Sequence, residues 1–98
     1  MPEKSNRTEN CVYIGKKPTQ KYIYESILLL NEHKSCILKA MGRSISHAVD
    51  VAEIIRKKYL SNAIIKNVDI ALEKRINPGR RYSKVSSIEI ILGQKKAQ

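Results

Sequence analysis

The sequence has neither tryptophan nor phenylalanine, only two cysteines and no long apolar run, and each absence excludes a class of protein. No apolar run approaches the ~18 residues of a membrane-spanning helix. Residues 1–10 are polar and mixed in charge, unlike a secretory signal peptide, so we expect a cytoplasmic protein in a reducing compartment. Cys11 and Cys36 are then interpreted as small core residues, with a disulfide or a redox role as the alternative.

The chain also lacks the motifs of common enzymes. It contains no glycine-rich phosphate loop, no nucleophile elbow and no Cys/His zinc spacing. His33 and His47 fall at the end of one expected helix and in the first turn of another, and neither has a nucleophile or an acid pair nearby in sequence. We interpret both as surface or capping residues, and expect no enzyme activity, no metal and no cofactor.

Acidic residues are scarce, which leaves a large excess of positive charge. Nine Asp and Glu face 19 Lys and Arg, a net charge of +10. Such an excess attracts polyanions over a Debye length of about 10 Å at ~0.1 M salt. Two windows without any acid, 11–24 and 74–84, hold eight of the ten net charges. Their cations are Lys16, Lys17 and Lys21 in the first window, and Lys74, Arg75, Arg80, Arg81 and Lys84 in the second.

What is present is the apolar patterning of one small domain with an aliphatic core. Short apolar runs predict buried strands at 11–15 and 35–41, and helical spacing predicts amphipathic helices over 19–33 and 44–59. Alternation predicts half-buried strands over 64–73 and 85–92, joined as a hairpin through the turn Asn77–Pro78–Gly79. This order predicts an α/β (α+β) two-layer sandwich, in which a mixed four-stranded sheet carries both helices on one face and every apolar stripe is buried.

The same pattern predicts how the domain is bounded. We expect a flexible N-terminal tail at 1–10, a single nucleic-acid-binding domain over 11–93 with a basic hairpin arm at 74–84, and a C-terminal tail at 94–98. Ser44 is the residue type favoured as the N-cap of the second helix, and Pro18 suits the start of the first.

The topology also predicts where the cations gather. Two parallel strands end at the same edge of a sheet, so Lys16 and Lys17 after the first strand and Arg43 after the second are expected to form one phosphate platform. The hairpin arm would reach along or into a groove. Only Tyr82 is an aromatic residue within the basic turns, so stacking on unpaired bases is weakly supported. Contacts to phosphates position a protein without reading sequence, which predicts low sequence specificity.

Three segments closely resemble the Alba family, in the same order along the chain: 14–18 (IGKKP), 38–50 (LKAMGRSISHAVD) and 85–90 (VSSIEI). Members of the Alba family are archaeal chromatin proteins with eukaryotic relatives in ribonucleoproteins. The resemblance covers about residues 11–93 of this chain. The resemblance implies the strand and helix order given above, a fold like the C-terminal domain of initiation factor three. It also implies a homodimer that binds double-stranded DNA, and often RNA, at the positions of Lys16, Lys17, Arg43 and the arm.

The resemblance further implies regulation and assembly. Lys16 matches a lysine whose acetylation weakens DNA binding in some members, which implies an acetyltransferase and a deacetylase as partners. Tyr59 stands near a position where many members have Phe, at a surface used for dimer–dimer contacts. The chain departs from the family where Met41 and His47 replace Arg and Lys, and where Lys21 adds a cation.

These observations lead to one function and one main alternative. We expect sequence-non-specific binding of double-stranded DNA, coating or compacting archaeal chromatin at the nucleoid. The alternative is an RNA-binding protein, a ribonucleoprotein subunit or RNA-stabilising factor, that uses the same platform. A scaffold acting by self-association would keep its function when Lys16 and Lys17 are neutralised. A membrane-surface role needs a helix with one basic and one bulky apolar face, which neither helix clearly has.

Overall fold

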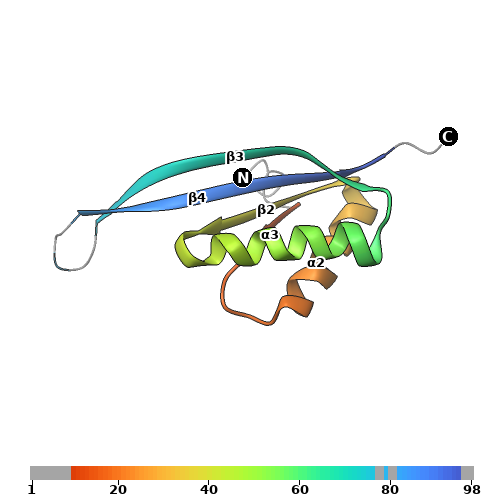
Figure 1. Cartoon of the computed structure of the whole chain (residues 1–98), viewed down its shortest axis with the longest axis horizontal. Helices are drawn as coiled ribbons and strands as arrows, with labels where there is room; N and C mark the ends of the chain where they lie inside the picture. The colour runs from red at the N-terminus through yellow and green to blue at the C-terminus, as the bar shows by residue number, and fades with distance from the viewer. Residues whose placement is uncertain (1–9, 77–78, 80–81, 96–98) are drawn as a thin grey trace, which may run out of the picture.

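The computed structural model describes residues 10–76, 79 and 82–95. The strand order in its four-stranded sheet is β1-β2-β4-β3, with β1 parallel to β2 and both other pairs antiparallel. Figure 1 shows α2 and α3 on the same side of this sheet. The predicted two-layer α+β fold is therefore confirmed. Its elements are β1 (Cys11–Tyr13), α2 (Thr19–His33), β2 (Ser35–Met41), η1 (Gly42–Ser44), α3 (Ile45–Ile54), η2 (Ile55–Tyr59), β3 (Ala63–Ile76) and β4 (Tyr82–Gln94).

Helix α2 forms over the predicted residues because its apolar side chains recur at helical spacing. Ile23 and Leu30 are buried against the sheet together with Tyr22. The helix ends where Lys34 adopts a left-handed backbone conformation (φ 66°) and donates its N–H to the carbonyl of Leu30 at 2.9 Å. This is a common way for a helix to end, and it turns the chain directly into β2.

The segment predicted as one helix over 44–59 is three helical pieces. A 3-10 turn, η1, comes before α3, and the π-helical turn η2 follows it. The backbone N–H of Leu60 donates to the carbonyl of Ile55 at 2.8 Å, the five-residue spacing of a π-helix. Ser44 stands at the N-cap position of α3, as predicted, but its backbone is already helical (φ −81°, ψ −5°) and its side chain makes no capping hydrogen bond.

The core between the two layers is aliphatic, as the composition predicts. Leu30, Leu38, Ile55 and Leu92 are fully buried, and Cys36 lies among the core residues with a free thiol. Cys11 is half-buried and its thiol is also free. The prediction that the cysteines are small core residues holds fully for Cys36.

Strand β3 departs from the prediction that every apolar stripe is buried. Ile70 is 78% exposed, and Val68 and Leu72 are exposed as well. Ile70 pairs with Ile88, which is buried on the helix-covered side of the sheet, so this stripe faces the same side as the helices. Helix α3 packs mainly on β2 and β4, so much of β3 is left without a covering helix. The stripe is therefore an uncovered apolar surface.

Several predicted features lie outside the described residues. They include the N-terminal tail except Asn10, residues 96–98, the turn residues Asn77 and Pro78, and the cations Arg80 and Arg81. Strand β4 continues to Gln94, and the N–H of Lys95 donates to the carbonyl of Asn62 at 2.8 Å. No helix within the described ranges is long and apolar enough to cross a membrane.

Candidate nucleic-acid interface

The edge of the sheet where β1 and β2 end carries the predicted phosphate platform. The two strands are parallel, with Tyr13 opposite Lys39, and the N–H of Ile14 donates to the carbonyl of Lys39 at 2.8 Å. The turn with Lys16 and Lys17 and the turn with Arg43 therefore leave the sheet at the same edge, as predicted from the topology. All three side chains are exposed.

Backbone geometry at Gly42 sets the position of Arg43. Gly42 has φ +56°, a left-handed conformation that side-chain-bearing residues rarely adopt. The chain turns there from β2 into η1, which places Arg43 at the rim of the sheet. The glycine in this segment is therefore needed for the direction of the chain.

The buried side chain of Tyr22 fixes the Lys16–Lys17 turn through hydrogen bonds. The Tyr22 side chain is 4% exposed, and its phenol oxygen accepts the backbone N–H groups of Gly15 at 2.9 Å and Lys17 at 3.0 Å. A buried tyrosine hydroxyl requires a polar partner, and here two turn amides provide it. The turn is thus fixed to the first buried residue of α2.

His47 holds the same turn from α3. Its Nδ1 atom lies 3.1 Å from the carbonyl oxygen of Gly15, and its Nε2 atom lies 2.8 Å from the hydroxyl of Thr19. A carbonyl only accepts, so Nδ1 carries the proton, and in the neutral ring Nε2 accepts from Thr19. The ring also packs edge-on against Tyr22, with centroids 5.4 Å apart. The interpretation of His47 as a surface or capping residue is therefore wrong.

The platform cations differ in how far they are neutralised. Across the described ranges, no carboxylate lies within ion-pairing distance of Lys16, Lys17 or Arg43. Lys21 forms an ion pair with Glu25 at 3.3 Å, one helical turn further along and just outside the acid-free window. Lys21 is thus close to the platform but partly compensated, whereas the other three cations present uncompensated charge to solvent.

The described part of the hairpin arm continues the positive charge away from the sheet edge. Lys74 on β3 lies directly opposite Lys84 on β4, and Arg75 lies opposite Ser83. Figure 1 shows both strands extending well beyond the helices toward the hairpin. The structure places Lys74, Arg75 and Lys84 on one projecting ribbon, separate from the platform.

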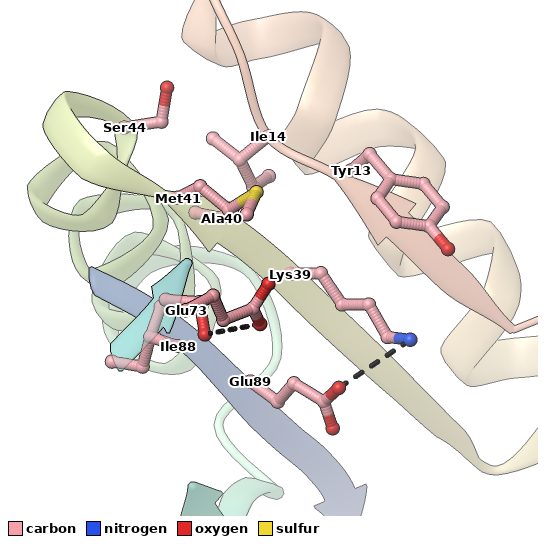
Figure 2. A pocket seen from close by; sticks show the side chains of 10 residues that line it. Tyr13, Ile14, Lys39, Ala40, Met41, Ser44, Glu73, Ile88 and Glu89 are labelled. Atoms are coloured by element: carbon pink, nitrogen blue, oxygen red, sulfur yellow. Dashed lines mark hydrogen bonds and ion pairs between the residues drawn. The ribbon is translucent and has the colours of Figure 1, made fainter. Parts of the chain in front are cut away.

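The open face of the sheet, opposite the helices α2 and α3, differs from the platform in its electrostatics. Lys39 lies 3.5 Å from the Glu89 carboxylate, and its ammonium stands 5.6 Å from the ring centre of Tyr13. Figure 2 shows this group beside Glu73, whose carboxylate accepts the hydroxyl of Ser87 at 3.0 Å. Burial alone would lower the pKa of Lys39, but the nearby Cys11 and Glu89 raise it, so the amine stays charged. Two carboxylates beside one ammonium make this face unsuited to duplex phosphates.

Tyr59 ends the π-helical turn η2 on the helix side of the molecule. Its ring is half-exposed, and its hydroxyl accepts a hydrogen bond from the Gln20 side-chain amide at 3.1 Å. This bond joins the end of η2 to the first turn of α2. Tyr59 is accessible for a contact with another molecule.

A basic sheet edge together with a separate, projecting basic hairpin, on a two-layer α+β fold, is typical of the class of small nucleic-acid-binding domains. Known proteins identify the particular family. The Alba family profile matches residues 10–72. The chain is 41% identical to DNA/RNA-binding protein Alba 1 of Archaeoglobus fulgidus, over 89% of this chain and 98% of that protein. It is 36% identical to DNA/RNA-binding protein Alba of Methanocella arvoryzae, over 99% and 97%. This chain belongs to the Alba family.

Solved structures agree with the family assignment. Alba from Thermoplasma volcanium superimposes with a TM-score of 0.80 at 40% identity, covering 87% of this chain and 100% of that one. ALBA1 from Trypanosoma brucei shares the fold with a TM-score of 0.71 at 22% identity, over 87% and 68%. The family consists of non-enzymatic proteins, in agreement with the expectation that this chain is not an enzyme.

Proposed function

We propose that this protein binds double-stranded DNA through its phosphates, with little preference for sequence. The observation that carries the proposal is the edge formed by Lys16, Lys17 and Arg43: three exposed cations, none of them ion-paired with another described residue, on turns that the fold holds in place. Charges of this kind contact phosphates in any sequence. The arm with Lys74, Arg75 and Lys84 adds contacts along a groove, and by sequence Arg80 and Arg81 extend them.

Family membership supports nucleic acid as the ligand. Two archaeal relatives are named DNA/RNA-binding proteins, and they match this chain over nearly its full length. We therefore propose an archaeal chromosomal protein that coats or compacts DNA at the nucleoid in the cytoplasm. The same platform suits RNA, because phosphates are common to both polymers, and RNA binding remains the alternative function.

The uncovered stripe on β3 supports a homodimer. Val68, Ile70 and Leu72 are exposed side by side on one strand, and Ile70 and Leu72 line a shallow depression with Ile45. Adjacent exposed apolar side chains mark a protein interface more often than a solvated surface. Pairing two copies through this stripe would leave the platform edge of each copy accessible. Tyr59, exposed on the other layer, is the proposed contact between dimers.

The position of Lys16 supports regulation through this residue. The side chain is exposed on the turn at the sheet edge, so an acetyltransferase and a deacetylase can reach it. Acetylation removes one charge from the platform and weakens its attraction for phosphate. Lys17 and Arg43 would remain charged, so we propose that acetylation reduces affinity rather than abolishing binding.

The proposal is tested by a salt titration of binding to one duplex, with wild-type protein and with Lys16→Ala/Lys17→Ala. We expect the slope of log affinity against log salt to become shallower by about one to two units. The matched control is Lys57→Ala/Lys58→Ala, an adjacent lysine pair on η2, which contacts β3. Equal slopes for wild type and the platform variant would contradict the assignment. RNA of matched length that displaces the duplex readily would favour the RNA alternative.

A further inference from the structure

Tyr13 lies on the open face of the sheet, close to the phosphate platform. It is the last residue of β1 and is 63% exposed, whereas its neighbour Val12 is buried under the helices. Strand alternation alone puts the ring on the uncovered side. The apolar run at 11–15 predicts a buried strand, whereas the Tyr13 ring at its centre is exposed. Only two residues separate it from Lys16.

The ring borders a hollow of about 370 Å³ in the open face. Figure 2 shows Tyr13 on one side of this hollow and Met41 and Glu73 on the other. Pockets that hold small organic ligands have volumes of about 300–1,000 Å³. The hollow is therefore large enough for one flat heterocycle lying against the tyrosine.

The polar groups of the hollow suit a nucleobase. The carboxylates of Glu89 and Glu73 accept hydrogen bonds, which exocyclic amino groups of adenine, cytosine and guanine donate. The Lys39 ammonium donates, and it lies between Glu89 and the Tyr13 ring. Unpaired bases bind proteins by stacking on aromatic rings while these edges are hydrogen-bonded.

The hollow adjoins the platform. Ile14 and Ser44 line it, and they stand next to Gly15 and Arg43 on the two turns of the platform edge. A strand whose phosphates contact that edge can place a neighbouring base over Tyr13. A base inside a duplex is stacked between its neighbours and cannot do this, so the ligand must be unpaired.

We propose that this hollow is a base-stacking site: an amino-bearing base of single-stranded nucleic acid stacks on Tyr13 while its flanking phosphates contact the platform of Lys16, Lys17 and Arg43. The inference rests on the proposed function, because the platform supplies the phosphate contacts. The hollow would add a second mode of binding, which is available only where the two strands of a nucleic acid are separated. The apolar stripe of β3 faces the other side of the sheet, so a dimer formed through it leaves the hollow open.

The test uses the full chain and a single-stranded oligonucleotide of about ten nucleotides with one central 2-aminopurine. An otherwise identical strand carries an abasic residue at that position. For the wild type we expect quenching of the 2-aminopurine fluorescence on binding, and tighter binding of the base-bearing strand. Tyr13→Ala should abolish the quenching and reduce affinity for that strand by about 5- to 100-fold, while Tyr13→Phe retains both effects.

Tyr24→Ala is the matched control, because Tyr24 on α2 is 64% exposed but lies in the helix layer. It should behave as the wild type. Equal affinity for the base-bearing and abasic strands, or quenching that survives Tyr13→Ala, would overturn the stacking site. Duplex binding is measured alongside: if the wild type does not bind the duplex, the platform itself fails, whereas intact duplex binding without base dependence rejects the hollow alone. RNA and DNA versions of the strand are compared, and quenching with either one supports the site.

Discussion

The phenol oxygen of Tyr22 lies 3.0 Å from the backbone nitrogen of Lys17 and accepts its hydrogen bond. A buried residue of the helix layer thus fixes the backbone from which two exposed lysines extend. A turn that is already ordered loses less conformational freedom when its side chains meet phosphate. We therefore expect the affinity of the proposed platform for phosphate to depend on Tyr22, which is not itself part of the platform.

Removing this hydroxyl is the most direct test of the relationship. Tyr22→Phe keeps the buried ring but leaves the N–H groups of Gly15 and Lys17 without their acceptor. We expect duplex affinity to fall by about 3- to 10-fold, and the free energy of unfolding to fall by about 1 kcal/mol. Fluorescence anisotropy and chemical denaturation measure the two effects. Tyr24→Phe, which removes an exposed hydroxyl, is the control, and equal behaviour of the two variants would contradict the role of Tyr22.

Most of the fold was predictable because its elements follow apolar periodicity. The spacing of Ile23, Ile27 and Leu30 predicts α2, and the run at 35–41 predicts β2, both with the observed bounds. The exposure of β3 was not predictable. Alternation shows that Val68 and Ile70 share a face, but it does not show whether another layer covers that face.

The site was predictable to the extent that topology places it. Parallel strands bring the turns after β1 and β2 to one edge, so the neighbourhood of Lys16 and Arg43 follows from the order of elements. The bonds of Tyr22 and His47 to the turn depend on side-chain packing between α2 and α3, which periodicity does not specify. A tyrosine within a buried helical stripe was the available signal, because its hydroxyl must find a partner.

The histidine that supports the turn should contribute to stability. His47→Leu leaves the Gly15 carbonyl without its donor and removes the bond to the Thr19 hydroxyl. We expect the free energy of unfolding to fall by about 1–3 kcal/mol, measured by urea denaturation. His33→Leu is the matched control, because this exposed residue ends α2 and its ring nitrogen lies 3.8 Å from the carboxylate of its neighbour Glu32. A loss for His47→Leu no larger than that for His33→Leu would contradict the supporting role.

The positive charge of the hairpin arm should favour DNA binding but should not stabilise the fold of the free protein. Lys84 lies directly opposite Lys74, and like charges across two strands repel. Lys84→Gln should therefore weaken duplex binding and make its salt slope shallower by about one unit, with no loss of thermal stability. Titration at several salt concentrations and a thermal melt measure both. A marked fall in melting temperature would mean that Lys84 stabilises the hairpin itself.

The apolar stripe on β3 should control the oligomeric state. Ile70 is 78% exposed, so Ile70→Asp replaces a surface side chain and should not disturb the core of the monomer. In the proposed dimer the carboxylate would be buried at the interface without a partner, which is strongly unfavourable. Sedimentation analysis should show a dimer for the wild type and a monomer for the variant. A dimer that persists in Ile70→Asp would contradict the role of the stripe.

The buried thiol of Cys36 should make stability fall at alkaline pH. Burial raises its pKa from 9.0 to about 11, against a smaller opposing effect of the hydrogen bond with Ser26. In the unfolded chain the thiol ionises near its ordinary value. As the pH rises from about 9 to 11, the unfolded state therefore loses its proton first and is favoured.

This difference of about two pH units corresponds to roughly 2–3 kcal/mol of stability lost across that range. Urea denaturation of reduced protein between about pH 8 and 10.5 should show the decline, and Cys36→Ala should lack that part of it. The comparison with the variant separates this thiol from the lysines and tyrosines that also titrate there. Parallel curves for the two proteins would show that Cys36 ionises in the folded state as readily as in the unfolded one. That result would favour the alternative interpretation of Cys36 as a redox residue, because an accessible thiolate is the reactive form of cysteine.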